Sequence, residues 1–128
     1  MNTSEKFQFI LVHGAWHGAW CWEKVVPLLK EAGHDVHTID LPGLGEDQTP
    51  LAEVTLEKYV SAVSALIVSI DHKVVLVGHS MGGIVITQAA ESISEKIDTL
   101  IYLTAFSPRH GETLLQYALE DTESFVTK

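Results

Sequence analysis

Short apolar runs alternate along the chain with longer segments in which apolar residues recur at helical spacing. Compact apolar runs bounded by polar or turn-forming residues are typical of buried strands. The pattern predicts four strands, at Phe7–Val12, Val36–Ile39, Lys73–Val77 and Ile97–Leu103. The third contains four consecutive aliphatic residues, which is typical of a parallel strand covered on both faces.

Three helices are predicted between these strands. The apolar face of the first is formed by Trp22, Val25, Val26 and Leu29. This helix is expected to end at Gly33, because glycine is the usual residue just past a helix C-terminus. Proline lacks the backbone N–H of a helix interior, so Pro27 either places the start of the helix near Lys24 or kinks it.

The second helix is predicted to begin after Thr55, whose hydroxyl can cap its free N–H groups. Its apolar stripe consists of Leu56, Tyr59, Val60, Val63, Ile67 and Ile70. A third helix is predicted over Gly82–Ser92, directly after a glycine-rich turn. Between the second strand and the second helix, Asp40–Pro50 contains two glycines and two prolines and is expected to be a loop.

Strands that alternate with helices in this way predict a parallel sheet with helices on both faces. The fold class is therefore α/β, with about four strands in one unit over residues 1–106. A polar tail follows over residues 107–128, with one weak helical stretch near Thr113–Leu119.

Composition narrows the function classes. The chain has 128 residues and a formal net charge of -9, so it repels phosphate backbones and nucleic acid is not an expected partner. Its one cysteine, Cys21, excludes an intrachain disulfide and suits a reducing compartment. No leader pattern and no apolar stretch of bilayer-spanning length are found. We therefore expect a cytoplasmic protein that does not bind a membrane.

The strongest chemical signal is Gly78-His79-Ser80-Met81-Gly82, between a predicted strand and a predicted helix. This arrangement resembles the nucleophile elbow of α/β-hydrolases, in which a serine sits on a sharp turn between two glycines. Ser80 is thus the candidate nucleophile. A dinucleotide-binding turn would need glycine where Ser80 stands, and that interpretation is rejected. No cofactor is expected.

A second glycine-rich segment, His13–Gly18, follows the first predicted strand. In α/β-hydrolases this loop supplies one N–H of the oxyanion hole, so Ala15 and Met81 are the candidate donors. Gly14, Trp16 and His79 are candidate substrate-binding residues. His13 and His17 have the spacing of a metal pair, but no third ligand is evident and no metal is expected. Core packing is expected for most of the tryptophans, Trp16, Trp20 and Trp22.

Five segments together resemble the plant methylesterase and hydroxynitrile lyase family of α/β-hydrolases and the bacterial esterases like them. They are Phe9–Trp22, Pro27–His34, Asp40–Gly43, Gly78–Gly83 and Thr104–Pro108. The resemblance covers roughly residues 7–120, and the last segment is where family members begin their cap region. It implies that residues 1–106 are the N-terminal part of the hydrolase core and that 107–128 begin the cap.

The resemblance also implies a serine, aspartate and histidine triad in that chain order. No residue of this chain matches the triad acid or histidine, because the family places both after two further strands. His110, the only histidine after Ser80, matches a cap-entry position instead. Only Ser80, Ala15 and Met81 are therefore carried over.

Three functions remain open. The first is a serine carboxylic ester hydrolase acting on a small-molecule ester. The second is a hydroxynitrile lyase, although lyases of the family carry a threonine where this chain has Gly14. The third is a truncated hydrolase-like chain without catalysis. Because the fourth strand ends the predicted sheet, its edge is expected to make the chain aggregation-prone, to pair in a homodimer, or to be completed by a further segment.

Overall fold

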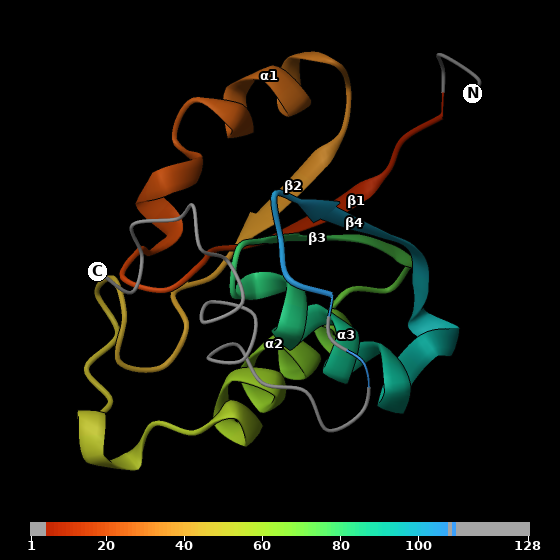
Figure 1. The fold of residues 1–128 in the computed structure, drawn as a ribbon. Helices are drawn as coiled ribbons and strands as arrows, with labels where there is room; N and C mark the ends of the chain where they lie inside the picture. The colour runs from red at the N-terminus through yellow and green to blue at the C-terminus, as the bar shows by residue number, and fades with distance from the viewer. Residues whose placement is uncertain (1–4, 108, 110–128) are drawn as a thin grey trace.

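The computed structural model describes residues 5–107 and 109. Its centre is a four-stranded parallel sheet in the order β2-β1-β3-β4 (Figure 1). The strands are β1 Gln8–Val12, β2 Asp35–Thr38, β3 Val74–His79 and β4 Ile97–Leu103. The predicted α/β architecture is confirmed. The third strand runs two residues beyond its predicted end, so that Gly78 and His79 belong to the strand.

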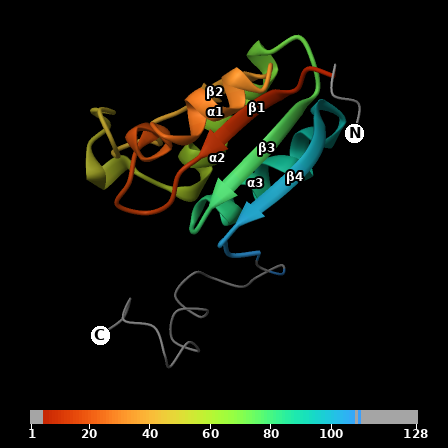
Figure 2. The same cartoon turned by 90° about the horizontal axis from the view of Figure 1, so that it is seen from above.

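Helices cover both faces of the sheet (Figures 1 and 2). Helix α1, Val25–Glu31, lies on one face, whereas α2, Leu56–Ser69, and α3, Gly82–Ile93, lie on the other. Short 3-10 turns occur at Ala19–Trp22, Leu51–Glu53 and Ser94–Lys96. All three predicted helices are therefore present, but Trp22 belongs to the turn before α1 and not to α1 itself.

Helix α1 settles the question that Pro27 raised. The helix begins at Val25, so Pro27 lies in its first turn, where no intrahelical N–H bond is lost. At the other end Gly33 has φ +98°, and its N–H donates to the carbonyl of Lys30 at 2.9 Å. The N–H of His34 donates to the carbonyl of Leu29 at 3.1 Å, which completes a Schellman motif.

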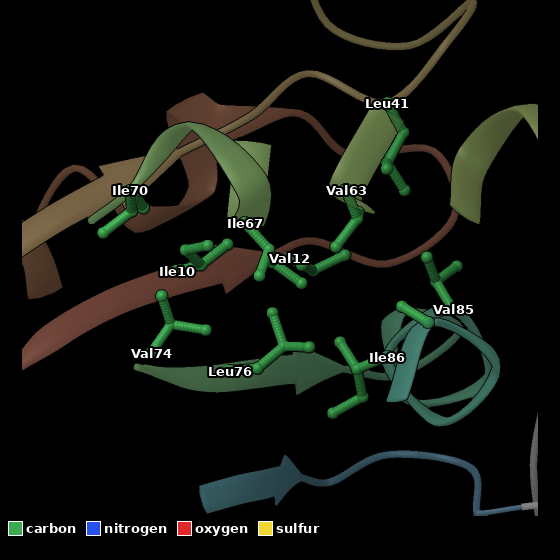
Figure 3. Packing of buried hydrophobic residues seen from close by; sticks show 11 residues of the cluster. Ile10, Val12, Leu41, Val63, Ile67, Ile70, Val74, Leu76, Val85 and Ile86 are labelled. Atoms are coloured by element: carbon green, nitrogen blue, oxygen red, sulfur yellow. The ribbon is translucent and has the colours of Figure 1, made fainter. Parts of the chain in front are cut away.

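The larger core fills the space between the sheet and helices α2 and α3 (Figure 3). Its buried residues are Ile10, Val12, Leu41, Val63, Ile67, Ile70, Val74, Leu76, Val85, Ile86 and Ala89. Leu56, predicted to share the apolar stripe of α2, is 45% exposed and does not join this core. Thr55 caps α2 as predicted, because its hydroxyl accepts from the N–H of Lys58 at 3.1 Å.

The second core lies on the α1 face. It is small and consists of Leu11, Trp22, Val75 and Val77, with partly buried neighbours from α1 and β1. Trp22 is the buried tryptophan; Trp16 and Trp20 are 78% and 59% exposed, so the expectation that most tryptophans pack in the core is wrong. Trp16 lies in the loop after β1, and Trp20 lies in the 3-10 turn Ala19–Trp22, where its indole stacks on the ring of His17.

Within residues 5–107, β4 pairs only with β3. Ile101 and Leu103 of β4 are 40% and 47% exposed. The predicted homodimer through this edge stays a prediction. None of the described helices is long and apolar enough to cross a membrane. His110 and the stretch Thr113–Leu119 lie outside the described residues.

Candidate active site

Two loops meet at the carboxyl edge of the sheet. In the β1–β3 ladder Val12 lies opposite Gly78, so both strands end at nearly the same level. The chain that follows β1, residues 13–18, therefore lies beside the turn that follows β3, residues 80–81. Ligands bind at this edge in open parallel sheets. The two glycine-rich segments identified in the sequence thus share one site.

Ser80 occupies a sharp turn between β3 and α3. Its φ is +55°, a left-handed backbone conformation that costs a non-glycine residue about 1–3 kcal/mol. The glycines around it permit the turn. A methyl group on Gly78 would lie 2.7 Å from the carbonyl oxygen of Gly82, and one on Gly82 would lie 2.6 Å from the carbonyl oxygen of Val12. Side chains at either position would push the turn away from the strands.

The turn is also fixed by hydrogen bonds to its own backbone. The carbonyl of Ser80 accepts from the N–H of Gly83 at 3.0 Å and from the N–H of Phe106 at 3.1 Å. Gly83 packs directly against the carbonyl oxygen of Phe106. The segment after β4 therefore holds the turn from the side opposite β1.

Gly14 faces the serine across the site. A methyl group on Gly14 would lie 2.9 Å from Cβ of Ser80 and 3.4 Å from its Oγ. The chain after Gly14 thus passes next to the serine hydroxyl. Ala15 is half-buried, and Trp16 after it has φ +61° and a largely exposed indole.

Met81 is the N-cap residue of α3, directly after Ser80. The first N–H groups of a helix have no carbonyl partner inside the helix. They also lie at the positive end of the helix dipole, which favours a negative charge nearby. The structure therefore places Gly14 against Ser80, with Ala15 and Met81 as the next residues along the two chains.

His13 is completely buried and uses both ring nitrogens. Its Nδ1–H donates to the carbonyl of Gly14 at 2.8 Å, and its Nε2 accepts from the N–H of Leu41 at 3.0 Å. Burial lowers the pKa of His13, which favours the neutral ring that these two bonds need. With neither nitrogen free, the ring is not a metal ligand, and residues 5–107 contain no group of side chains that could hold a metal ion.

An open cleft of about 340 Å³ lies on the α1 side of the elbow. Its lining residues are His17, Cys21, Trp22, Val25, His79 and Leu103. His79 stands edge-on to both His17, at 6.1 Å between ring centroids, and Trp22, at 6.3 Å. Burial, followed by the neighbouring His17, lowers the pKa of His79. Within the described residues, none of these imidazoles hydrogen-bonds to the hydroxyl of Ser80.

Asp40 was assigned no individual role from the sequence, yet its carboxylate joins the chain after β1 to the loop after β2. Its carboxylate accepts from the N–H of Ala19 at 2.7 Å and from the N–H of Glu46 at 3.3 Å. Gly18 and Gly45 pack closely against this carboxylate, which leaves no space for a side chain at either position. The sequence feature that could have revealed this role is an aspartate directly after a predicted strand and followed by spaced glycines.

Comparison with known proteins places these features in context. The sequence matches the family described as "Alpha/beta hydrolase family" over residues 9–125. It is 48% identical over 111 residues to Methylesterase 1 of Arabidopsis thaliana, covering 84% of this chain and 42% of that protein. It is 46% identical over 109 residues to the carbendazim hydrolyzing esterase of Nocardioides sp. strain SG-4G, covering 84% of this chain and 45% of that protein.

The fold agrees with a solved structure of the same kind. The crystal structure of polyneuridine aldehyde esterase superposes with a TM-score of 0.81 at 39% sequence identity. The match covers 91% of this chain and 46% of that protein. The chain therefore spans less than half the length of these relatives.

Proposed function

Because the chain belongs to the α/β-hydrolase family, and to its methylesterase-like members, we propose that it is part of a serine carboxylic ester hydrolase. The observation that carries the proposal is the strained turn that presents Ser80 beside Gly14 at the carboxyl edge of the sheet. The Ser80 hydroxyl attacks the ester carbonyl, the alcohol leaves, and an acyl-serine forms. Water then hydrolyses this intermediate and regenerates the serine.

The N–H groups of Ala15 and Met81 stabilise the oxyanion that develops during both steps. Support comes from the position of each residue next to Ser80, one through the packing of Gly14 and one at the start of α3. Donors of this kind are fixed by the fold before the reaction starts. Removal of one typically lowers kcat about 10²–10³-fold.

Proton transfer needs a base that reaches the serine hydroxyl to within about 2.6–3.2 Å. No described histidine makes that contact, and the match to the relatives leaves more than half of their length unaccounted for. The base and its orienting acid therefore come from outside the described residues. We further propose that His79, which lines the cleft beside the elbow, and the exposed Trp16 contact the substrate.

These relatives are named as esterases, which supports an ester as the substrate class. Gly14 argues against the lyase alternative, because it carries no hydroxyl and a side chain there would press on Ser80.

The proposal is tested by treating the purified chain with a fluorophosphonate probe and measuring its intact mass. We expect one adduct, lost in Ser80→Ala and kept in Ser92→Ala, a matched change at an exposed serine of α3. Labelling that survives Ser80→Ala would contradict the assignment of the nucleophile. A folded chain that does not label would contradict catalysis by this chain alone.

A further inference from the structure

We propose that His13 is a positioning residue, which fixes the direction of the Ala15 N–H through its hydrogen bond to Gly14, and that His17 assists it. The inference rests on the oxyanion role proposed above for Ala15. It concerns the two histidines whose spacing resembled a metal pair and which the proposed reaction does not otherwise use.

The first step of the argument is the geometry of one peptide group. The His13 Nδ1–H donates to the carbonyl of Gly14 at 2.8 Å. That carbonyl and the N–H of Ala15 belong to the same planar, trans peptide unit, and they point in opposite directions. A bond that holds the carbonyl therefore also sets the direction of the N–H.

The second step is the anchoring of the His13 ring. Its Nε2 accepts from the N–H of Leu41 at 3.0 Å, and both residues are completely buried. The ring therefore bridges the loop after β1 and the loop after β2, and it cannot turn without breaking a buried hydrogen bond. Because a carbonyl only accepts and an N–H only donates, the ring must be the neutral tautomer with its proton on Nδ1.

The third step concerns the next peptide group along the chain. The Nδ1–H of His17 donates to the carbonyl of Ala15 at 2.7 Å, and the ring of His17 stacks on Trp20 at 5.4 Å between centroids. The peptide groups before and after Ala15 are thus each held by an imidazole. These two hydrogen bonds also account for the left-handed backbone conformation of Trp16, which an unrestrained loop would lose.

The arrangement matters to Ser80 because Gly14 packs against it without spare room. If His13 only filled space in the core, a hydrogen bond to any partner would satisfy each of its ring nitrogens. His13 instead binds the one peptide group that lies between Gly14 and Ala15. The structure therefore assigns it to the oxyanion loop, not to the core alone.

Two substitutions separate these roles. In His13→Asn the side-chain amide reaches the place of Nδ1 and can donate to Gly14, but not as far as Leu41. In His13→Gln the amide reaches the place of Nε2 and keeps only the Leu41 contact. Each variant loses one buried hydrogen bond, so similar thermal midpoints are expected.

The first readout is the rate of fluorophosphonate labelling at Ser80. We expect His13→Asn to stay within about threefold of the natural chain and His13→Gln to fall roughly tenfold or more, toward the loss expected for an absent oxyanion donor. Equal losses of labelling rate in the two variants, proportional to their losses of stability, would overturn the proposal.

The second readout does not depend on reactivity. The ¹⁵N order parameter of the Ala15 amide is expected near the rigid value of about 0.85 in the natural chain and in His13→Asn, and to fall toward about 0.6 in His13→Gln. An unchanged value in His13→Gln would overturn the positioning role. A natural chain that never labels, but shows this difference, would contradict the proposed hydrolase function and leave the positioning role standing.

If the His13 variants do not fold, His17→Phe tests whether the imidazoles hold the peptide groups around Ala15. It keeps a ring to stack on Trp20 and removes only the donor to Ala15. The same fall in the order parameter of the Ala15 amide is expected. A rigid Ala15 in this variant would contradict the proposed hold.

Discussion

Replacing Gly14 by alanine would place a methyl group against the side chain of Ser80. The methyl carbon would lie 2.9 Å from Cβ of Ser80 and 3.1 Å from the carbonyl oxygen of His79. Ordinary contact begins near 3.4 Å, so about half an ångström must be relieved by movement of the loop or of the turn. Such overpacking typically costs about 1–3 kcal/mol of unfolding free energy.

The same movement displaces the reacting groups from one another. A misplacement of about 1 Å can lower a rate roughly 10²-fold, so half that displacement gives about a tenfold loss. We therefore expect Gly14→Ala to slow fluorophosphonate labelling of Ser80 about tenfold. Labelling rates and urea unfolding, measured on the same preparation, give both quantities.

Gly33→Ala is the matched control. Gly33 ends α1 with φ +98°, and a methyl group there would meet no atom within 4 Å. The left-handed backbone alone costs alanine about 1–2 kcal/mol. This variant should therefore lose comparable stability and label at the natural rate. Natural labelling in Gly14→Ala, or equal slowing in both variants, would refute the steric argument.

Three further predictions concern stability and association. Thr55→Ala removes the cap of α2 and should lower the unfolding free energy by about 1 kcal/mol, measured by urea unfolding; an unchanged midpoint would contradict the capping role. Burial lowers the pKa of His13 below 6.5 and outweighs the hydrogen bond to Gly14 and the carboxylate of Asp40, which both raise it. The contribution of His13 to the unfolding free energy is therefore complete above pH 6.5 and is lost as pH falls through the lowered pKa. Urea unfolding between pH 7.5 and 5 should show this loss of unfolding free energy, and His13→Asn should show a smaller loss. Parallel pH curves for the two chains would contradict the prediction. If β4 pairs with a second copy of the chain, light scattering should give the mass of a dimer, and Ile101→Lys should reduce it to that of a monomer. A monomeric mass for the unsubstituted chain would contradict this interface.

The elements that the sequence predicted best have clear signals at both ends. Ile97–Leu103 coincides with β4, because polar residues precede it and residues that favour strands, such as Thr99, Ile101 and Tyr102, follow Asp98. The third strand was predicted to end at Val77, since a glycine normally interrupts a strand pattern. In the structure Gly78 still pairs with Val12 on one side and Tyr102 on the other. Neighbouring strands thus extend β3, and the local sequence cannot show this.

Side-chain roles depended still more on distant partners. Ser80 could be proposed as the nucleophile from the sequence because the turn that carries it is built from adjacent residues. The function of His13 is decided by the N–H of Leu41, which lies 28 positions later in the chain. Asp40 likewise gains its role from Ala19 and Glu46. Spacing alone left His13 and His17 as a metal pair or as turn residues, and only the contacts distinguish these possibilities.

These contacts also separate two requirements of the proposed reaction. Stabilising an oxyanion needs N–H groups with fixed directions, and the described residues provide them through a strained turn, close glycines and two anchored imidazoles. Moving a proton needs a mobile base with a suitable pKa, and both His13 nitrogens are already engaged. A histidine held by two buried hydrogen bonds is suited to the first requirement and unsuited to the second. Within the described residues, the contacts of His13 therefore suit rigidity, and no histidine there hydrogen-bonds to the Ser80 hydroxyl.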